Sequence, residues 1–124
     1  MNDIIVGVDQ SATARKAAES AAEFAAKCGT NLHLVTCVKG GDSSSQATTW
    51  LDELSRSLPH NRITSKVGIG DPAEILVEEA TRLNARMIVV GNVRVQGVAR
   101  VLGSIALDVA KHAPCDVLIA NTAS

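Results

Sequence analysis

Short apolar runs alternate with helix-type segments along the whole chain, and this alternation limits the fold more than any other feature. Segment 3–8, DIIVGV, and segment 85–90, ARMIVV, are continuous and rich in β-branched residues, as strands buried on both faces are. Between such runs, apolar residues recur at helical spacing. The predicted strands are 3–8, 31–38, 62–69, 85–90 and 116–120, and the predicted helices are 11–28, 45–58, 72–83 and 103–113.

The order of the predicted elements favours an α/β fold, a three-layer sandwich with helices on both faces of a mainly parallel sheet. Segment 62–69, RITSKVGI, is more polar than the other strands, so we expect it near an edge. Segment 116–120, DVLIA, is apolar and terminal, and we also expect it at an edge. The chain has 124 residues, of which 46% are hydrophobic, and no linker or repeat interrupts it. We therefore predict one domain over residues 1–124.

Capping residues mark the ends of the predicted helices. Ser11 is placed to cap the helix 11–28, and Gly29 is placed to end it. Asp71 and Pro72 suit the N-cap and the first helical position of the third helix. In the last helix, the register predicted to face the core is Val101, Ile105, Val109 and Ala113.

Three candidate binding segments follow predicted strands. Asp9 follows the first strand, residues 37–39 end the second, and residues 91–104 follow the fourth. In a parallel sheet the carboxyl ends of the strands share one edge, and ligands bind there where the strand order reverses. The sequence therefore predicts that a ligand site, if present, lies at this edge.

The loop GNVRVQGVARVLGS, residues 91–104, leads from an apolar run into a helix. Glycine lets the backbone approach a phosphate closely, and the N-terminus of a helix adds unpaired N–H groups and a partial positive charge. Gly103 and Ser104 offer that geometry. Glycines between a strand and a helix more often serve the turn alone, and neither a Walker A sequence nor a dinucleotide fingerprint occurs. On the pattern alone, a phosphate cradle and a plain connection both stay open.

Composition and charge argue against two classes of partner. The net charge is −1 and the aromatic residues are only Phe24 and Trp50, so neither a basic face nor a stacking platform for nucleic acid is expected. No apolar run approaches the length that crosses a membrane, and the first residues lack a signal-type pattern. We therefore expect no nucleic acid, no membrane and a cytoplasmic location.

Cysteine and histidine are too scattered to predict a dedicated metal site. Cys28, Cys37 and Cys115 form no CxxC pair and fit a reducing compartment as buried thiols. The histidines at 33, 60 and 112 lack the spacing of metal ligands.

Several stretches resemble the universal stress protein family, and together they span nearly the whole chain. These are IIVGVDQS at the start, MIVVGN in the middle, and LGSIALDVAKHAPCDVLI near the end. The resemblance implies a five-stranded parallel sheet in the order 3-2-1-4-5. It also implies a homodimer, here through an antiparallel pairing of residues 117–120 (Val117 to Ala120) about a two-fold axis.

The resemblance further implies an adenine nucleotide at the edge of the sheet, such as ATP, AMP or cyclic AMP. The acid after the first strand, Asp9, lies by the ribose, and the region of Cys37 lies by adenine. The family's phosphate motif is matched at Gly91 and at Gly103 with Ser104, whereas Arg94 replaces its second glycine and the loop is one residue short. The predicted nucleotide-binding residues are Asp9, Cys37, Gly91, Asn92, Arg94, Gly97, Gly103, Ser104 and Ile105.

Three functions stay open at this point: a nucleotide-binding stress or signalling module, a dimeric interaction protein that binds no nucleotide, and a slow ATPase. Catalysis has the least support, because no base and nucleophile are paired in the sequence. Asp71 is explained as a helix cap, and His112 at a helix end is explained structurally.

Overall fold

Strands and helices alternate strictly along the described part of the chain in a computed structural model. The structure describes residues 3–10, 12–40, 44–91 and 103–121. The strands are β1 (Ile4–Gly7), β2 (Leu32–Val38), β3 (Ile63–Ile69), β4 (Met87–Gly91) and β5 (Asp116–Ala120), and the helices are α1 (Ala12–Cys28), α2 (Ser44–Ser57), α3 (Pro72–Leu83) and α4 (Ser104–His112). The alternation read from the sequence is thus confirmed, with boundaries shifted by one or two residues.

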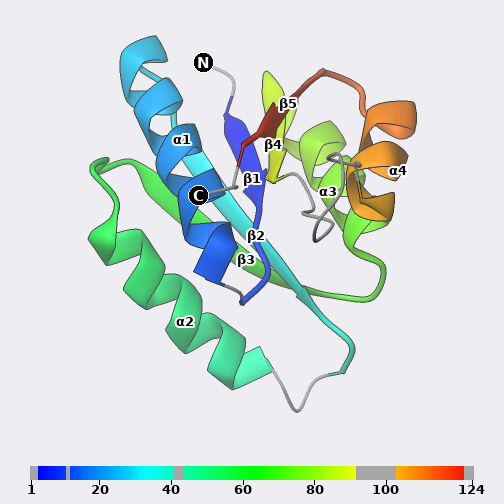
Figure 1. Cartoon of the computed structure of the whole chain (residues 1–124), viewed down its shortest axis with the longest axis horizontal. Coiled ribbons are helices and arrows are strands. Elements are labelled where there is room, and N and C mark those ends of the chain that lie inside the picture. The colour runs from blue at the N-terminus through cyan, green and yellow to red at the C-terminus, as the bar shows by residue number, and fades with distance from the viewer. Residues whose placement is uncertain (1–2, 11, 41–43, 92–102, 122–124) are drawn as a thin grey trace, which may run out of the picture.

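The strands form one parallel sheet in the order β3-β2-β1-β4-β5. Figure 1 shows α1 and α2 on one face and α3 and α4 on the other, which completes three layers. The predicted α/β class, strand order and parallel direction are confirmed. Both predicted edge strands, β3 and β5, also lie at the edges.

Each face of the sheet has its own core. Small residues let α1 lie close to the sheet, and Ala18, Ala21 and Ala25 are fully buried there. Gly29 ends the helix with φ of 69°, a left-handed conformation that glycine adopts without steric cost. The predicted end of this helix is therefore confirmed. The predicted cap Ser11 lies outside the described residues.

Helix α3 is held close to the sheet by two glycines. A Cβ on Gly7 would lie 2.7 Å from Leu76 Cδ1, and one on Gly68 would lie 2.8 Å from Ile75 Cγ2. Such distances leave no room for a side chain unless Leu76 or Ile75 shifts. The first turn of α3 is fixed as the sequence predicts, because Asp71 Oδ2 accepts from the Glu74 N–H at 3.0 Å and Pro72 follows the cap.

Two predictions about burial are wrong. Ile105 is 43% exposed, whereas Ala106 and Val109 face the core. Helix α4 packs on both α3 and the sheet, and that placement turns Ile105 toward solvent. The predicted core residue Val101 lies outside the described residues. The cysteines are half-buried rather than buried. Cys28 and Cys37 lie at or next to the end of an element, where the covering layer is incomplete.

A buried carboxylate ties α3 to β2 and β3, and the sequence did not reveal it. Glu79 is 3% exposed and accepts from Arg82 at 2.7 and 3.0 Å and from Lys66 at 2.8 Å. His33 Nε2 lies 3.0 Å from the same carboxylate, and His33 Nδ1 lies 2.6 Å from Thr64 Oγ1. The hydrogen bond from Arg82, helped by those from Lys66 and His33 and opposed by burial, lowers the pKa of Glu79 from 4.5 to about 2.

We predict that Glu79→Gln destabilises the fold by about 3 kcal/mol at neutral pH, since the shifted pKa measures the preference for the charged form. A lowered folded-state pKa contributes stability above pH 4.5, and this contribution is lost as the pH falls toward about 2. Urea unfolding at pH 7 and pH 3 should therefore show a smaller difference between variant and wild type at pH 3. The exposed neighbour Glu78→Gln is the control, and an equal loss at both pH values would contradict the assignment.

Candidate functional site

The candidate site lies at the carboxyl ends of β1 and β4, which are neighbours in the sheet. β1 is followed by the buried Val8, whose N–H donates to Val35 O at 2.9 Å, and then by the exposed Asp9. β4 ends at Gly91. The chain continues from β1 to one side of the sheet and from β4 to the other. This is the topological switch point at which open α/β sheets bind ligands. Asp9 and Gly91 thus lie at the ends of neighbouring strands, as the sequence predicts.

The N-terminus of α4 supplies donors for an anion. Gly103 is the N-cap, with φ of −70° and ψ of 165°, and as a glycine it has no side chain to cap the first N–H groups of the helix. Ser104 and Ile105 are exposed in the first turn. Unpaired N–H groups, the helix dipole and a serine hydroxyl suit a phosphate. The structure therefore places Gly103, Ser104 and Ile105 at the start of α4, and their role in binding stays a prediction.

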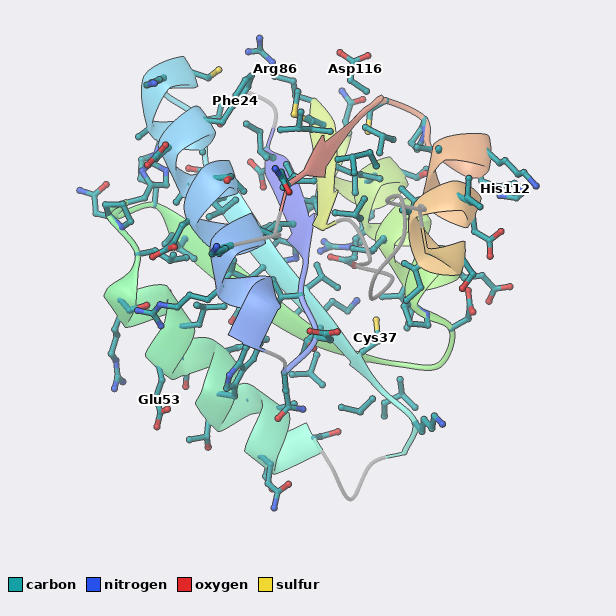
Figure 2. All side chains as sticks on the ribbon, in the orientation of Figure 1. Phe24, Cys37, Glu53, Arg86, His112 and Asp116 are labelled. Carbon is teal, nitrogen blue, oxygen red and sulfur yellow. The ribbon has the colours of Figure 1, made fainter. Side chains whose placement is uncertain are left out.

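Cys37 lies at the third predicted position, next to the end of β2. It packs against the core on the α3 and α4 face, and Figure 2 shows its side chain near the carboxyl end of the strand. Its partner in register is Gly68, which leaves the space beside the thiol without a side chain from β3. Burial, and then the nearby charge of Asp71, raise the pKa of Cys37 from 9.0 to about 11. The thiol is therefore neutral at physiological pH.

Asp71 is a residue of this edge whose second contact was not foreseen from the sequence. The Gly70 N–H donates to Val38 O at 3.0 Å and so holds the turn between β3 and α3 against the end of β2. This brings the Asp71 carboxylate within electrostatic reach of Cys37. The signal was present in the sequence, since a residue just after a parallel strand lies at the same edge as Asp9 and Gly91.

Three predicted site residues, Asn92, Arg94 and Gly97, lie outside the described residues. Among the residues that the structure does describe, no group of three or more His, Cys, Asp or Glu side chains could hold a metal ion. Within the same ranges, no helix is long and apolar enough to cross a membrane.

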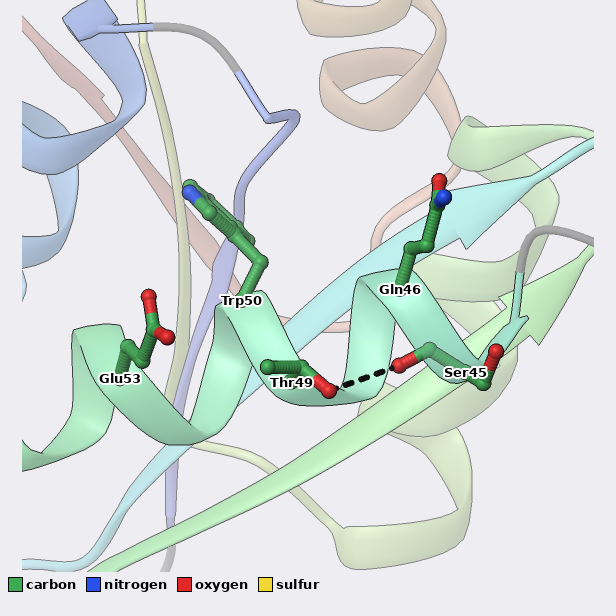
Figure 3. A pocket seen from close by; sticks show the side chains of 5 residues that line it. All are labelled: Ser45, Gln46, Thr49, Trp50 and Glu53. Atoms are coloured by element: carbon green, nitrogen blue, oxygen red, sulfur yellow. Dashed lines mark hydrogen bonds between the residues drawn. The ribbon is translucent and has the colours of Figure 1, made fainter.

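A second hollow lies along one side of α2. Ser45, Gln46, Thr49, Trp50 and Glu53 line it, and all five come from this helix, as Figure 3 shows. Thr49 Oγ1 donates to Ser45 O at 3.0 Å, which is a local contact within the helix. Trp50 also packs against the core under α1 and α2. The hollow holds one carboxylate and no pair of catalytic groups, so the edge of the sheet stays the stronger candidate.

A model of the universal stress protein family matches residues 1–121. The chain belongs to this family. The resemblance inferred from the stretches at both ends of the chain is thereby confirmed, and it accounts for the sheet order observed.

Solved structures of other universal stress proteins share the fold. One that was determined in complex with cyclic AMP is 29% identical, with 98% of each chain covered and a TM-score of 0.79. A protein of the family from Burkholderia pseudomallei is 27% identical, covering 95% of this chain and 94% of that one, with a TM-score of 0.64. A universal stress protein from Archaeoglobus fulgidus in complex with dAMP is 24% identical, covering 97% of this chain and 98% of that one, with a TM-score of 0.77.

We predict that Cys37 reacts slowly with alkylating reagents in the native protein, because its raised pKa leaves little thiolate. At pH 8.5, iodoacetamide should modify native Cys37 about tenfold more slowly than Cys37 in urea. Asp71→Asn should speed the native reaction, since it removes the charge that opposes ionisation, whereas Glu74→Gln on the same helix turn should not. Peptide mass spectrometry gives the rates, and equal rates in native and unfolded protein would contradict the prediction.

Proposed function

We propose that this universal stress protein binds an adenine nucleotide at the carboxyl ends of β1, β2 and β4. The observation that supports the proposal most is the placement of Asp9, Gly91 and the N-terminus of α4 around the switch point. The cyclic AMP complex of a relative with 29% identity over 98% of both chains supports the ligand class. A cytoplasmic role as a stress-response or signalling module belongs to the same proposal.

Each end of the site has a different chemistry. Asp9 would accept from ribose hydroxyls, because a carboxylate is an acceptor only. The N–H groups after Gly103 and the Ser104 hydroxyl would donate to phosphate oxygens. Backbone groups near Cys37 would face the base. The nucleotide would thus run from α4, past the end of β1, toward the end of β2.

The sequence of the phosphate loop favours a ligand with a single phosphate. Arg94 stands where the family motif has its second glycine, and the loop is one residue short. A shorter loop offers fewer backbone donors, while a guanidinium holds phosphate as a charged fork. We therefore propose AMP or cyclic AMP as better ligands than ATP.

We predict that Gly103→Val abolishes nucleotide binding and leaves the fold intact, because a β-branched side chain would cover the first N–H groups of α4. Ala110→Val, at an exposed position of the same helix, is the matched control and should bind normally. Calorimetry with cyclic AMP, AMP and ATP measures the affinities. Arg94→Gly separates two roles, since weaker binding means that Arg94 holds the phosphate and tighter binding means that it blocks the site. No heat with any ligand at millimolar concentration would refute the function.

The alternative function, a dimeric interaction protein that binds no nucleotide, is favoured by the edges of the sheet. β5 lies at one edge, and its Val117, Leu118 and Ile119 are only half-buried. At the other edge, β3 presents the exposed Ser65 and Lys66, and polar or lysine side chains discourage pairing. We propose that residues 117–120 pair with a second copy across a two-fold axis, which is compatible with nucleotide binding as well.

We predict that Ile119→Pro converts a dimer to a monomer, because the Ile119 N–H points away from β4 and proline removes this donor from the free edge of β5. Light scattering at concentrations of about tens of micromolar, well above the Kd of a tight dimer, gives the mass, and circular dichroism checks folding. Ser65→Pro on the opposite edge is the matched control and should stay dimeric. If Ile119→Pro fails to fold, Ile119→Lys keeps the backbone donor and puts a charge on the edge. A monomeric wild type would rule out the dimer.

A further inference from the structure

The turn between β3 and α3 places a carboxylate at the base end of the proposed nucleotide site. The sheet order β3-β2-β1-β4 sets the sequence of groups along the edge: the phosphate donors after β4, then Asp9 after β1, then Cys37 at β2, then Asp71 after β3. Neighbouring strands lie about 4.8 Å apart, so about 14 Å separates the ends of β4 and β3. That span matches an extended nucleoside monophosphate with one hydrogen bond at each end.

Helix capping uses only half of the Asp71 carboxylate. Oδ2 accepts from the Glu74 N–H at 3.0 Å. In the part of the chain that the structure describes, Oδ1 takes part in no hydrogen bond, and the side chain is exposed. Serine, threonine or asparagine would cap the helix equally well, so the cap does not require a negative charge.

The surroundings of Asp71 make this edge an acceptor. The Gly70 N–H is already used by Val38 O, and the thiol of Cys37 stays neutral because of its raised pKa. Asp71 therefore supplies the negative charge that acts on Cys37. A ligand group that donates a hydrogen bond is stabilised beside Asp71, whereas a ligand carbonyl is repelled by its negative charge.

We propose that Asp71 is a base-selectivity residue of the nucleotide site: its Oδ1 accepts from the exocyclic amine of adenine and disfavours the carbonyl that guanine or hypoxanthine presents at the same place. Adenine and guanine differ in this group, a donor in one and an acceptor in the other. The inference rests on the proposed function, because it presumes a nucleotide with its phosphate at α4.

The test compares cyclic AMP with cyclic IMP, whose bases differ at position 6 and the adjacent N1. Wild type should bind cyclic AMP about tenfold or more tightly, as expected for one hydrogen bond to a charged group. Asp71→Asn keeps the helix cap and adds an amide that donates. The preference should therefore fall to about one or invert, while the Tm stays near that of wild type. Glu74→Gln makes the same change of charge one turn away and should leave the preference unchanged.

The outcomes separate this inference from the proposed function. If wild type binds neither cyclic nucleotide, both are overturned. If wild type binds both equally, or if Asp71→Asn binds cyclic AMP with an unchanged preference, nucleotide binding stands and the role of Asp71 is overturned. A shift of the preference in Glu74→Gln as large as that in Asp71→Asn would also overturn it, because general charge would then explain the effect.

Discussion

The pairing of β1 with both β2 and β4 is the constraint on which the rest of the structure depends. Ile4 lies opposite Leu32 on one side and Met87 on the other, and the three apolar residues of this strand are fully buried. Because β1 is buried on both faces and paired on both sides, the chain that follows it can reach solvent only beyond the carboxyl end of the strand. The next residues, Val8 and Asp9, therefore emerge at the switch point, where the loop after β4 also begins.

Helix α3 converts this frame into a defined edge. Gly7 and Gly68 let the helix lie against the sheet, and Glu79 fixes its second half through Lys66 of β3 and His33 of β2. A buried carboxylate with several donors strongly penalises any movement that would leave it unpaired. Since the helix cannot slide, its N-cap at Asp71 stays beside the end of β2. The contacts of Glu79 in the second half of α3 thus help to fix the position of Asp71 at its N-terminus.

The charge changes sign along this edge of the sheet, and this change sets the orientation of the proposed ligand. The N-terminus of α4 attracts negative charge, whereas Asp9 and Asp71 lie toward the other side and favour donors. A nucleotide has the complementary arrangement, with an anion at one end and hydroxyl and amine donors at the other. The neutral thiol of Cys37 lies between the acids and adds no charge of its own.

The alternation of apolar runs and the capping residues were enough to predict the class of fold and the extent of each element. They also predicted that Asp9, Gly91 and Gly103 lie at the same edge of the sheet. These features follow from local periodicity and from the geometry of parallel sheets. The family resemblance added the strand order. Contacts between distant segments could not be predicted in this way. Glu79, which no sequence pattern singles out, is buried with His33 and Lys66 only because α3 crosses β2 and β3. Ile105 faces outward because α4 packs on α3 as well as on the sheet. Asp71 acts on Cys37 because one backbone hydrogen bond, from Gly70 N–H to Val38 O, holds the turn against the end of β2.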